Sequence, residues 1–141
     1  MASRRKAREC ALQMLFQWDI GRDAPDQVEE LFWSNTRPRE EEPLHEAANG
    51  LFRGTVEAVK EIDRRIRRTA EHWRPERMAA VDRNILRLGT YELLYRRDTP
   101  GPVVINEALE IARKFSSEES VQFINGLLDR VRKEVENSTA A

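Results

Sequence analysis

The stretch that decides the fold class runs from Ser3 to Trp18 and reads SRRKARECALQMLFQW. The apolar residues that recur at the spacing of one helical face are Ala7, Cys10, Ala11, Met14, Leu15 and Trp18. Ser3 can cap the start of this helix, and Gly21 can end it. The pattern predicts an amphipathic helix that has a core-facing side and a basic beginning.

Helical spacing continues on both sides of a polar segment. A shorter helix is expected from Pro25, and its inward residues are Val28, Leu31 and Phe32. Residues 35–43 are polar and charged, which predicts a loop. A third helix is expected to begin at Pro43, because proline suits the first helical position. Its inward residues are Leu44, Ala47, Ala48, Leu51, Thr55 and Val59, and a basic continuation through Ile62 and Ile66 is expected to end near Trp73.

Three further helices are predicted in the second half of the chain. The first spans roughly residues 76–96, and its inner residues are Met78, Val81, Ile85, Leu88 and Leu94. Residues 99–102, TPGP, must interrupt the helical pattern, because two prolines and a glycine cannot continue it. The inner face of the next helix is Val104, Ala108, Ile111, Ala112 and Phe115. The last helix covers about residues 119–136, with the apolar stripe Phe123, Leu127, Leu128 and Val131, and residues 137–141 are expected to form an unstructured tail.

These patterns predict an all-α fold. No segment alternates apolar and polar residues for long enough to indicate a strand. Six or seven helices joined by mostly short loops indicate two packed helical subbundles. At 141 residues the chain has the length of one ordinary domain, so we expect residues 1–141 to form a single domain.

Composition points to a soluble cytoplasmic protein. Hydrophobic residues make up 40% and charged residues 35% of the chain, and mean hydropathy is -0.70, which is typical of a globular protein with a solvated surface. Cys10 is the only cysteine, so no internal disulfide can form, and this fits a reducing compartment. Because the N-terminus lacks an apolar signal region and no apolar run is long enough to span a bilayer, we expect no membrane association.

The residues that carry most enzymatic chemistry are scattered or sit in unsuitable places. Cys10 lies on the apolar face of the first helix, where a buried structural role is expected. His45 and His72 are 27 positions apart and fit no metal-ligand spacing. The glycines form no phosphate-binding loop, and Glu40, Glu41 and Glu42 lie in the polar segment. The sequence therefore predicts neither an enzyme nor a bound metal or cofactor.

Charge is segregated along the chain, although the formal net charge is only -1. Residues 1–20 carry four basic and two acidic side chains, and residues 51–97 carry twelve basic and seven acidic ones. On a helical wheel Arg4, Arg5 and Arg8 fall on one side of the first helix, an arrangement that suits contact with a phosphate backbone. The alternative is that these charges are only the solvated faces of helices.

Three segments, in order, resemble NusB proteins. Residues 4–19, RRKARECALQMLFQWD, resemble the opening helix of that family, and residues 81–93, VDRNILRLGTYEL, resemble its central helix. Residues 103–131, VVINEALEIARKFSSEESVQFINGLLDRV, resemble its C-terminal half, in which INEA and F-[IV]-N-G are the most distinctive motifs. The resemblance covers about residues 4–133, and the acidic stretch at residues 21–45 matches loosely.

This resemblance implies both a fold and a function. The fold is two three-helix subbundles packed as one compact domain of about seven helices. NusB proteins pair with the ribosomal protein NusE and bind the boxA element of nascent RNA, which is single-stranded. That complex helps RNA polymerase resist termination, notably on ribosomal RNA operons, and it has no catalytic step and no cofactor.

The resemblance also carries over residue by residue to an RNA surface. The basic helix start corresponds to phosphate and base contacts at Arg4, Arg5, Lys6 and Arg8. The aromatic residue of the F-[IV]-N-G motif is Phe123, which in the family lies against an RNA base. The alternative is a core aromatic, because Leu127 and Val131 share its stripe. Gln122 is a polar candidate for a base contact, at a position where the family often has lysine.

The partner surface is assigned to one residue. The acidic residue that opens the central-helix motif corresponds to Asp82, which the resemblance places at the interface with NusE. The alternative is a helical carboxylate that pairs with Arg83 or with the helix dipole. We expect Asn125 and Gly126 to let two helices approach closely rather than to contact RNA.

Two other functions and the oligomeric state stay open at this point. RNA methyltransferases can carry a NusB-like domain, but the chain shows no Rossmann-type segment, so we expect no catalytic domain. A protein–protein scaffold of the transcription complex without direct RNA binding is the second alternative, which the basic helix start disfavours. The sequence is compatible with a monomer and with a homodimer.

Overall fold

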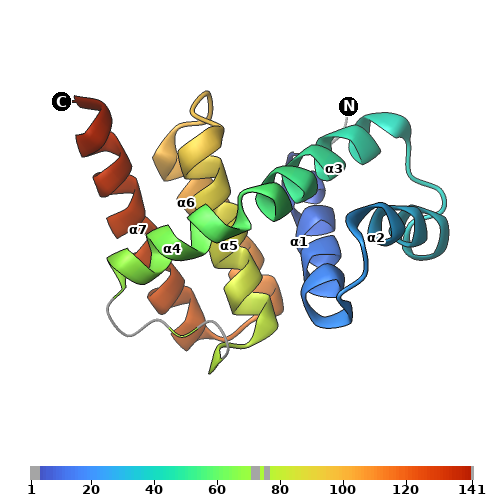
Figure 1. Ribbon diagram of the computed structural model, residues 1–141, viewed down its shortest axis with the longest axis horizontal. Helices are drawn as coiled ribbons and strands as arrows, with labels where there is room; N and C mark the ends of the chain where they lie inside the picture. The colour runs from blue at the N-terminus through green and yellow to red at the C-terminus, as the bar shows by residue number, and fades with distance from the viewer. Residues whose placement is uncertain (1–3, 71–73, 75–76, 141) are drawn as a thin grey trace. The chain divides into compact units, whose positions relative to one another are not determined.

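Helices account for nearly all of the computed structural model, which describes residues 4–70, 74 and 77–140 (Figure 1). Within these residues there are seven α-helices and one π-helical turn, and no strand. The all-α prediction is therefore confirmed. By its internal contacts the chain divides into two compact units, residues 1–57 and residues 58–141.

The first unit contains α1 (Arg4–Gly21), α2 (Pro25–Leu31), the π-helical turn η1 (Phe32–Thr36) and α3 (Glu42–Glu57). α1 packs against α3 and α2. The largest fully buried side chains of this unit are Met14, Leu15, Val28, Phe32 and Phe52. They fill its core. In the same unit, Trp33 Nε1 donates a part-buried hydrogen bond of 2.8 Å to Asn49 Oδ1.

The second unit contains α4 (Val59–Thr69), α5 (Ala80–Tyr95), α6 (Gly101–Phe115) and α7 (Glu118–Ala140). α5 is its central helix, because every residue from Asn84 to Leu93 is buried and α4, α6 and α7 all pack against it. α5 and α7 meet closely at Gly89, where an added Cβ would lie 3.0 Å from Leu128 Cδ1. A larger residue at position 89 would push the two helices apart.

One long predicted helix is two helices in the structure. The sequence pattern ran without interruption from Pro43 to near Trp73, whereas α3 ends at Glu57 and α4 begins at Val59, on either side of Ala58. The buried residues of α3 belong to the core of the first unit, while Ile62 and Ile66 are buried in the second unit. The helix is interrupted because its first part packs into the core of one unit and its second part into the core of the other. No proline or glycine stands at the break.

Other helix boundaries also move. α6 begins at Gly101 with Pro102 in its first turn, where no N–H is needed, so the interruption covers residues 96–100. α7 continues to Ala140, beyond the predicted end at residue 136, because no proline or glycine follows Gly126 to stop it. The expected cap Ser3 and the expected boundaries near Trp73 and residue 76 lie outside the described residues.

Candidate nucleic-acid interface

The four basic side chains at the start of α1 differ in their exposure. Arg4 and Arg5 are exposed on the first turn. Lys6 Nζ lies 2.7 Å from Glu40 Oε1, in the segment that precedes α3. Arg8 is only 6% exposed. Arg4 and Arg5 are therefore the exposed cations of this helix start, whereas Lys6 is half-buried in an ion pair and Arg8 is mostly covered.

The ion pair of Lys6 also defines the local electrostatics. The hydrogen bond from Lys6 lowers the pKa of Glu40, and Arg37 contributes with its Nη1 at 3.2 Å from Glu40 Oε1. The carboxylate therefore stays charged at neutral pH and neutralises part of the cationic helix start. Nothing in the sequence pattern indicated this pairing, because Lys6 and Glu40 are far apart along the chain.

Phe123 lies on the surface of α7. Its side chain is 45% exposed, although Ile124 next to it and Val121 two residues before it are buried. The alternative of a core aromatic is therefore wrong, and Ile124 takes the place that the predicted stripe gave to Phe123. Gln122 is exposed beside Phe123, so the two neighbours are both available to solvent.

The prediction for Asn125 and Gly126 is wrong. Both residues are exposed, and a Cβ built on Gly126 would have no atom within 4 Å. The close helix approach occurs at Gly89 instead.

A second exposed aromatic residue was missed at the sequence level. Phe115 is the last residue of α6 and is 39% exposed, whereas its spacing had placed it on the inner face. Lys114 Nζ lies 5.3 Å from the centre of the Phe115 ring. The pair of an aromatic face and a cation is of the type that holds single-stranded nucleic acid.

Asp82 fixes the connection between α6 and α7. Its carboxylate, in the first turn of α5, accepts a hydrogen bond from Ser116 Oγ and another of 2.7 Å from Ser120 Oγ. Ser120 belongs to the first turn of α7, one turn before Phe123. The carboxylate thus positions the helix that carries Phe123, a role that the sequence did not indicate.

A model of the NusB family matches residues 5–133. The chain belongs to the NusB family. This assignment agrees with the resemblance of the three sequence segments and with the exposed aromatic of the F-[IV]-N-G motif.

NusB proteins of known sequence and structure match almost the full chain. The transcription antitermination protein NusB of Koribacter versatilis is 56% identical over 134 residues, which cover 95% of this chain and 91% of that protein. The solved structure of T. maritima NusB is 39% identical and superposes with a TM-score of 0.83, covering 94% of this chain and 92% of that chain. A solved complex of antitermination factors NusB and NusE with double-stranded RNA gives a TM-score of 0.82 at 26% identity, covering 93% and 96% of the two chains.

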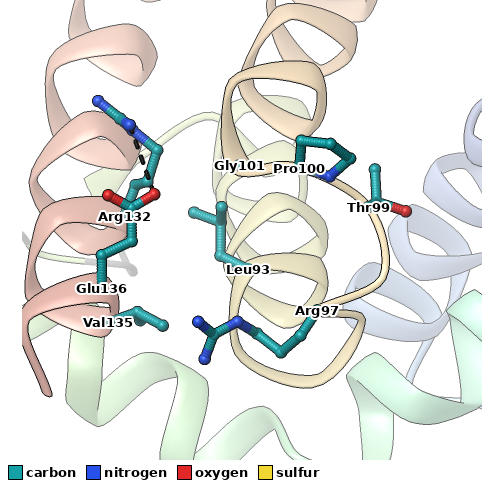
Figure 2. Close-up of a pocket in the computed structure, with 8 residues that line it drawn as sticks. All are labelled: Leu93, Arg97, Thr99, Pro100, Gly101, Arg132, Val135 and Glu136. Atoms are coloured by element: carbon teal, nitrogen blue, oxygen red, sulfur yellow. Dashed lines mark hydrogen bonds and ion pairs between the residues drawn. The ribbon is translucent and has the colours of Figure 1, made fainter. Parts of the chain in front are cut away.

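A separate hollow lies near the C-terminal end of α5, whereas Asp82 lies in the first turn of that helix. It has a volume of about 200 Å³ and is lined by Leu93, Arg97, Thr99, Pro100, Gly101, Arg132, Val135 and Glu136 (Figure 2). Arg132 is paired with Asp129 at 2.8 Å and with Glu136 at 3.5 Å. The hollow contains none of the residues that the sequence assigned to RNA or to the partner.

Neither a cluster of metal-ligating side chains nor a membrane-spanning helix is found within the described residues. Histidine, cysteine and carboxylate side chains there form no group of three or more that could hold a metal ion. None of the helices in that part of the chain is both long enough and apolar enough to span a membrane.

Proposed function

We propose that the protein is a transcription antitermination factor that binds boxA-type RNA in nascent transcripts together with the ribosomal protein NusE. In this role it helps RNA polymerase resist termination, notably on ribosomal RNA operons. The proposal is supported by relatives that are transcription antitermination proteins and by a solved relative in complex with NusE and RNA.

The observation that carries the proposal is the exposure of Phe123. An apolar ring that is 45% exposed, next to the fully buried Ile124 and inside the family motif, is not needed for the core. Single-stranded RNA is bound by stacking its bases on such rings and by hydrogen bonds to the base edges. Phe123 supplies the ring, and Gln122 supplies an amide for a base edge.

Arg4 and Arg5 supply the electrostatic part of the proposed interface. Both are exposed cations on the first turn of a rigid helix, an arrangement suited to phosphate contacts. Lys6 joins them only by giving up its pair with Glu40, and Arg8 is mostly buried. Each of the two units then contributes one RNA-binding surface.

Pairing with NusE is the second part of the proposal, and Asp82 is its candidate residue. Because the Asp82 carboxylate already holds Ser116 and Ser120, its effect on pairing is either direct contact or positioning of the α6–α7 connection. Asp82→Asn keeps an oxygen for one hydroxyl, whereas Asp82→Lys reverses the charge. If calorimetry gives the wild-type affinity for NusE with a folded Asp82→Lys protein, Asp82 has no part in the pairing.

The salt dependence of RNA binding tests the proposed phosphate contacts of Arg4 and Arg5 directly. Arg4→Ala/Arg5→Ala is compared with Arg22→Ala/Arg39→Ala, which removes two exposed arginines of the same unit. Binding of a labelled boxA-like RNA is followed by fluorescence anisotropy at several salt concentrations. Each lost phosphate contact lowers the log–log salt slope by roughly 0.7, so the first variant should lose about 1.4 and the control nothing. An unchanged slope for the first variant would exclude this helix start from the interface.

A further inference from the structure

The outer face of α4 carries an isolated basic stripe. Lys60, Arg64 and Arg67 are exposed and follow the i, i+4, i+7 spacing of one helical face. Ile62 and Ile66 are fully buried on the other side of the same helix. The stripe extends over about 10 Å of helix axis and contains no large apolar side chain.

The acidic residues of α4 neutralise only one cation of this stripe, Arg64. Asp63 is turned inward and paired with Arg87, whose Nη2 lies 2.9 Å from Asp63 Oδ2. Glu61 accepts a hydrogen bond of 3.0 Å from Arg64 Nε at the edge of the stripe. Within the described residues Lys60 and Arg67 take part in no ion pair, so their charges face solvent.

α4 crosses α7 at a carboxylate that is already neutralised. Glu134 of α7 accepts hydrogen bonds from Arg68, from Arg65 at 3.3 Å and from Thr69 at 3.1 Å. Burial alone would raise the pKa of Glu134, but these donors outweigh it and the pKa is lowered. The negative charge of Glu134 at the crossing is therefore offset by its donors, and the carboxylate does not repel an anion bound along the two helices.

The exposed side of α7 leads from Phe123 to this crossing. Arg130 is exposed and lies seven residues after Phe123, so the two share one face of the helix. Glu134 follows one turn later on the same side, about 16 Å along the axis from Phe123. Along α7, Arg130 therefore lies between Phe123 and the crossing with α4, and all of these residues belong to the second unit.

We infer that Arg130, Arg67, Arg64 and Lys60 form a second RNA-binding surface, the α4–α7 track, for the phosphates of nucleotides that flank the bases bound at Phe123. The inference rests on the proposed RNA binding and extends it. A stacked strand carries one phosphate per about 3.4 Å, so roughly five nucleotides span the 16 Å from Phe123 to the crossing. The occupant is a polyanion rather than a protein surface, since an interface with a protein needs apolar or aromatic anchors that the track lacks.

The test compares a short boxA-like RNA with the same RNA extended on its 5′ side, its 3′ side or both. Each extension is about ten nucleotides long, which exceeds the roughly five nucleotides that span the distance from Phe123 to the crossing. The track variant is Lys60→Gln/Arg67→Gln/Arg130→Gln, which leaves the ion pairs of Arg64 and Arg68 intact. The control variant is Arg22→Gln/Arg39→Gln/Arg97→Gln, which removes three other exposed cations. Affinities are measured by anisotropy from about 50 to about 200 mM salt, the range over which phosphate contacts are lost.

With wild-type protein, an extended RNA should have a salt slope steeper by up to about 2 than the short RNA. This value corresponds to one phosphate contact each for Lys60, Arg67 and Arg130, because Arg64 stays paired with Glu61. Over the fourfold salt range this corresponds to a loss of roughly 20-fold more affinity. The track variant should bind the short RNA normally and lose the extra slope, while the control keeps it. Equal slopes for short and extended RNA with wild-type protein, or equal losses in the two variants, would refute the track. Failure of wild-type protein to bind the short RNA even with NusE would instead refute the proposed function.

Discussion

Phe123 and Ile124 are neighbours in one turn of α7, and their truncation to alanine should have opposite effects. A buried phenylalanine costs about 3–5 kcal/mol of folding stability when it is truncated. Phe123 is 45% exposed, so only about half of that contact is at stake, and alanine also has the higher helix propensity. We therefore expect Phe123→Ala to lower the free energy of unfolding by no more than about 2 kcal/mol.

The same change should act strongly on RNA. A lost base-stacking contact costs about 1–3 kcal/mol, which corresponds to a dissociation constant higher by roughly 5-fold to 150-fold. The salt slope should stay almost unchanged, because Phe123→Ala removes no charge. Tyr95→Ala is the matched control for the loss of an exposed aromatic side chain in the same unit, and it should bind RNA as the wild-type protein does.

Ile124→Ala provides the opposite case. Ile124 is 0% exposed, and its truncation should cost about 2–5 kcal/mol of stability. At a temperature where it is still folded, this variant should bind RNA with nearly wild-type affinity. Thermal melts followed by circular dichroism, beside anisotropy isotherms, measure both effects.

The reasoning fails if the two variants exchange their behaviour. A Phe123→Ala protein that melts as early as Ile124→Ala, yet binds RNA normally while folded, would show that the ring stabilises the fold and does not stack on a base.

Three further predictions concern the second unit. Asp82→Ala should lower stability by about 1–3 kcal/mol in chemical denaturation, because two hydroxyl groups lose a charged acceptor, and an unchanged midpoint would contradict the positioning role. Gly89→Val should lower stability by about 1–3 kcal/mol, because the added side chain meets Leu128, whereas Gly126→Val should be nearly neutral, and equal melting temperatures would contradict the close approach of α5 and α7. The pKa of Glu134 is lowered from 4.5, so the stability that its charged form contributes is present above about pH 4.5 and is lost as the pH falls through the folded-state pKa. The difference in stability between wild type and Glu134→Gln should therefore close below about pH 4.5. A difference that stays constant with pH would count against the ion-pair cluster.

The helices themselves could be predicted from local sequence, because the 3.6-residue period depends only on which residues are apolar. The face of α1 that contains Ala7, Cys10, Ala11 and Leu15 is buried as predicted. The period fails where packing decides between two faces that differ by one residue. Phe123 and Ile124 both fit the stripe of α7, and only the neighbouring helices determine which of them is buried.

Helix boundaries and long-range side-chain contacts could not be predicted from the sequence for a related reason. The apolar pattern passes through Ala58 without change, so nothing local indicates that α3 and α4 belong to different cores. Lys6 pairs with Glu40, and Asp82 holds Ser116 and Ser120, across more than 30 residues in each case. Such contacts require the tertiary arrangement, which single-sequence periodicity does not contain.

The candidate RNA residues came from the family resemblance, and the structure sorts them by accessibility. Arg4, Arg5, Gln122 and Phe123 are exposed, while Arg8 is not. Exposure is the property that the sequence pattern could not supply, since an arginine on a helix start can be either solvated or covered.

The most direct test of the central claim is the affinity of the wild-type protein for a boxA-like RNA, measured by gel shift with and without NusE and against a scrambled RNA of equal length. We expect sequence-selective binding that becomes tighter when NusE is present, because the two proteins together contact more nucleotides than either alone. Equal affinity for the boxA-like and scrambled RNAs, with no change on addition of NusE, would contradict the account.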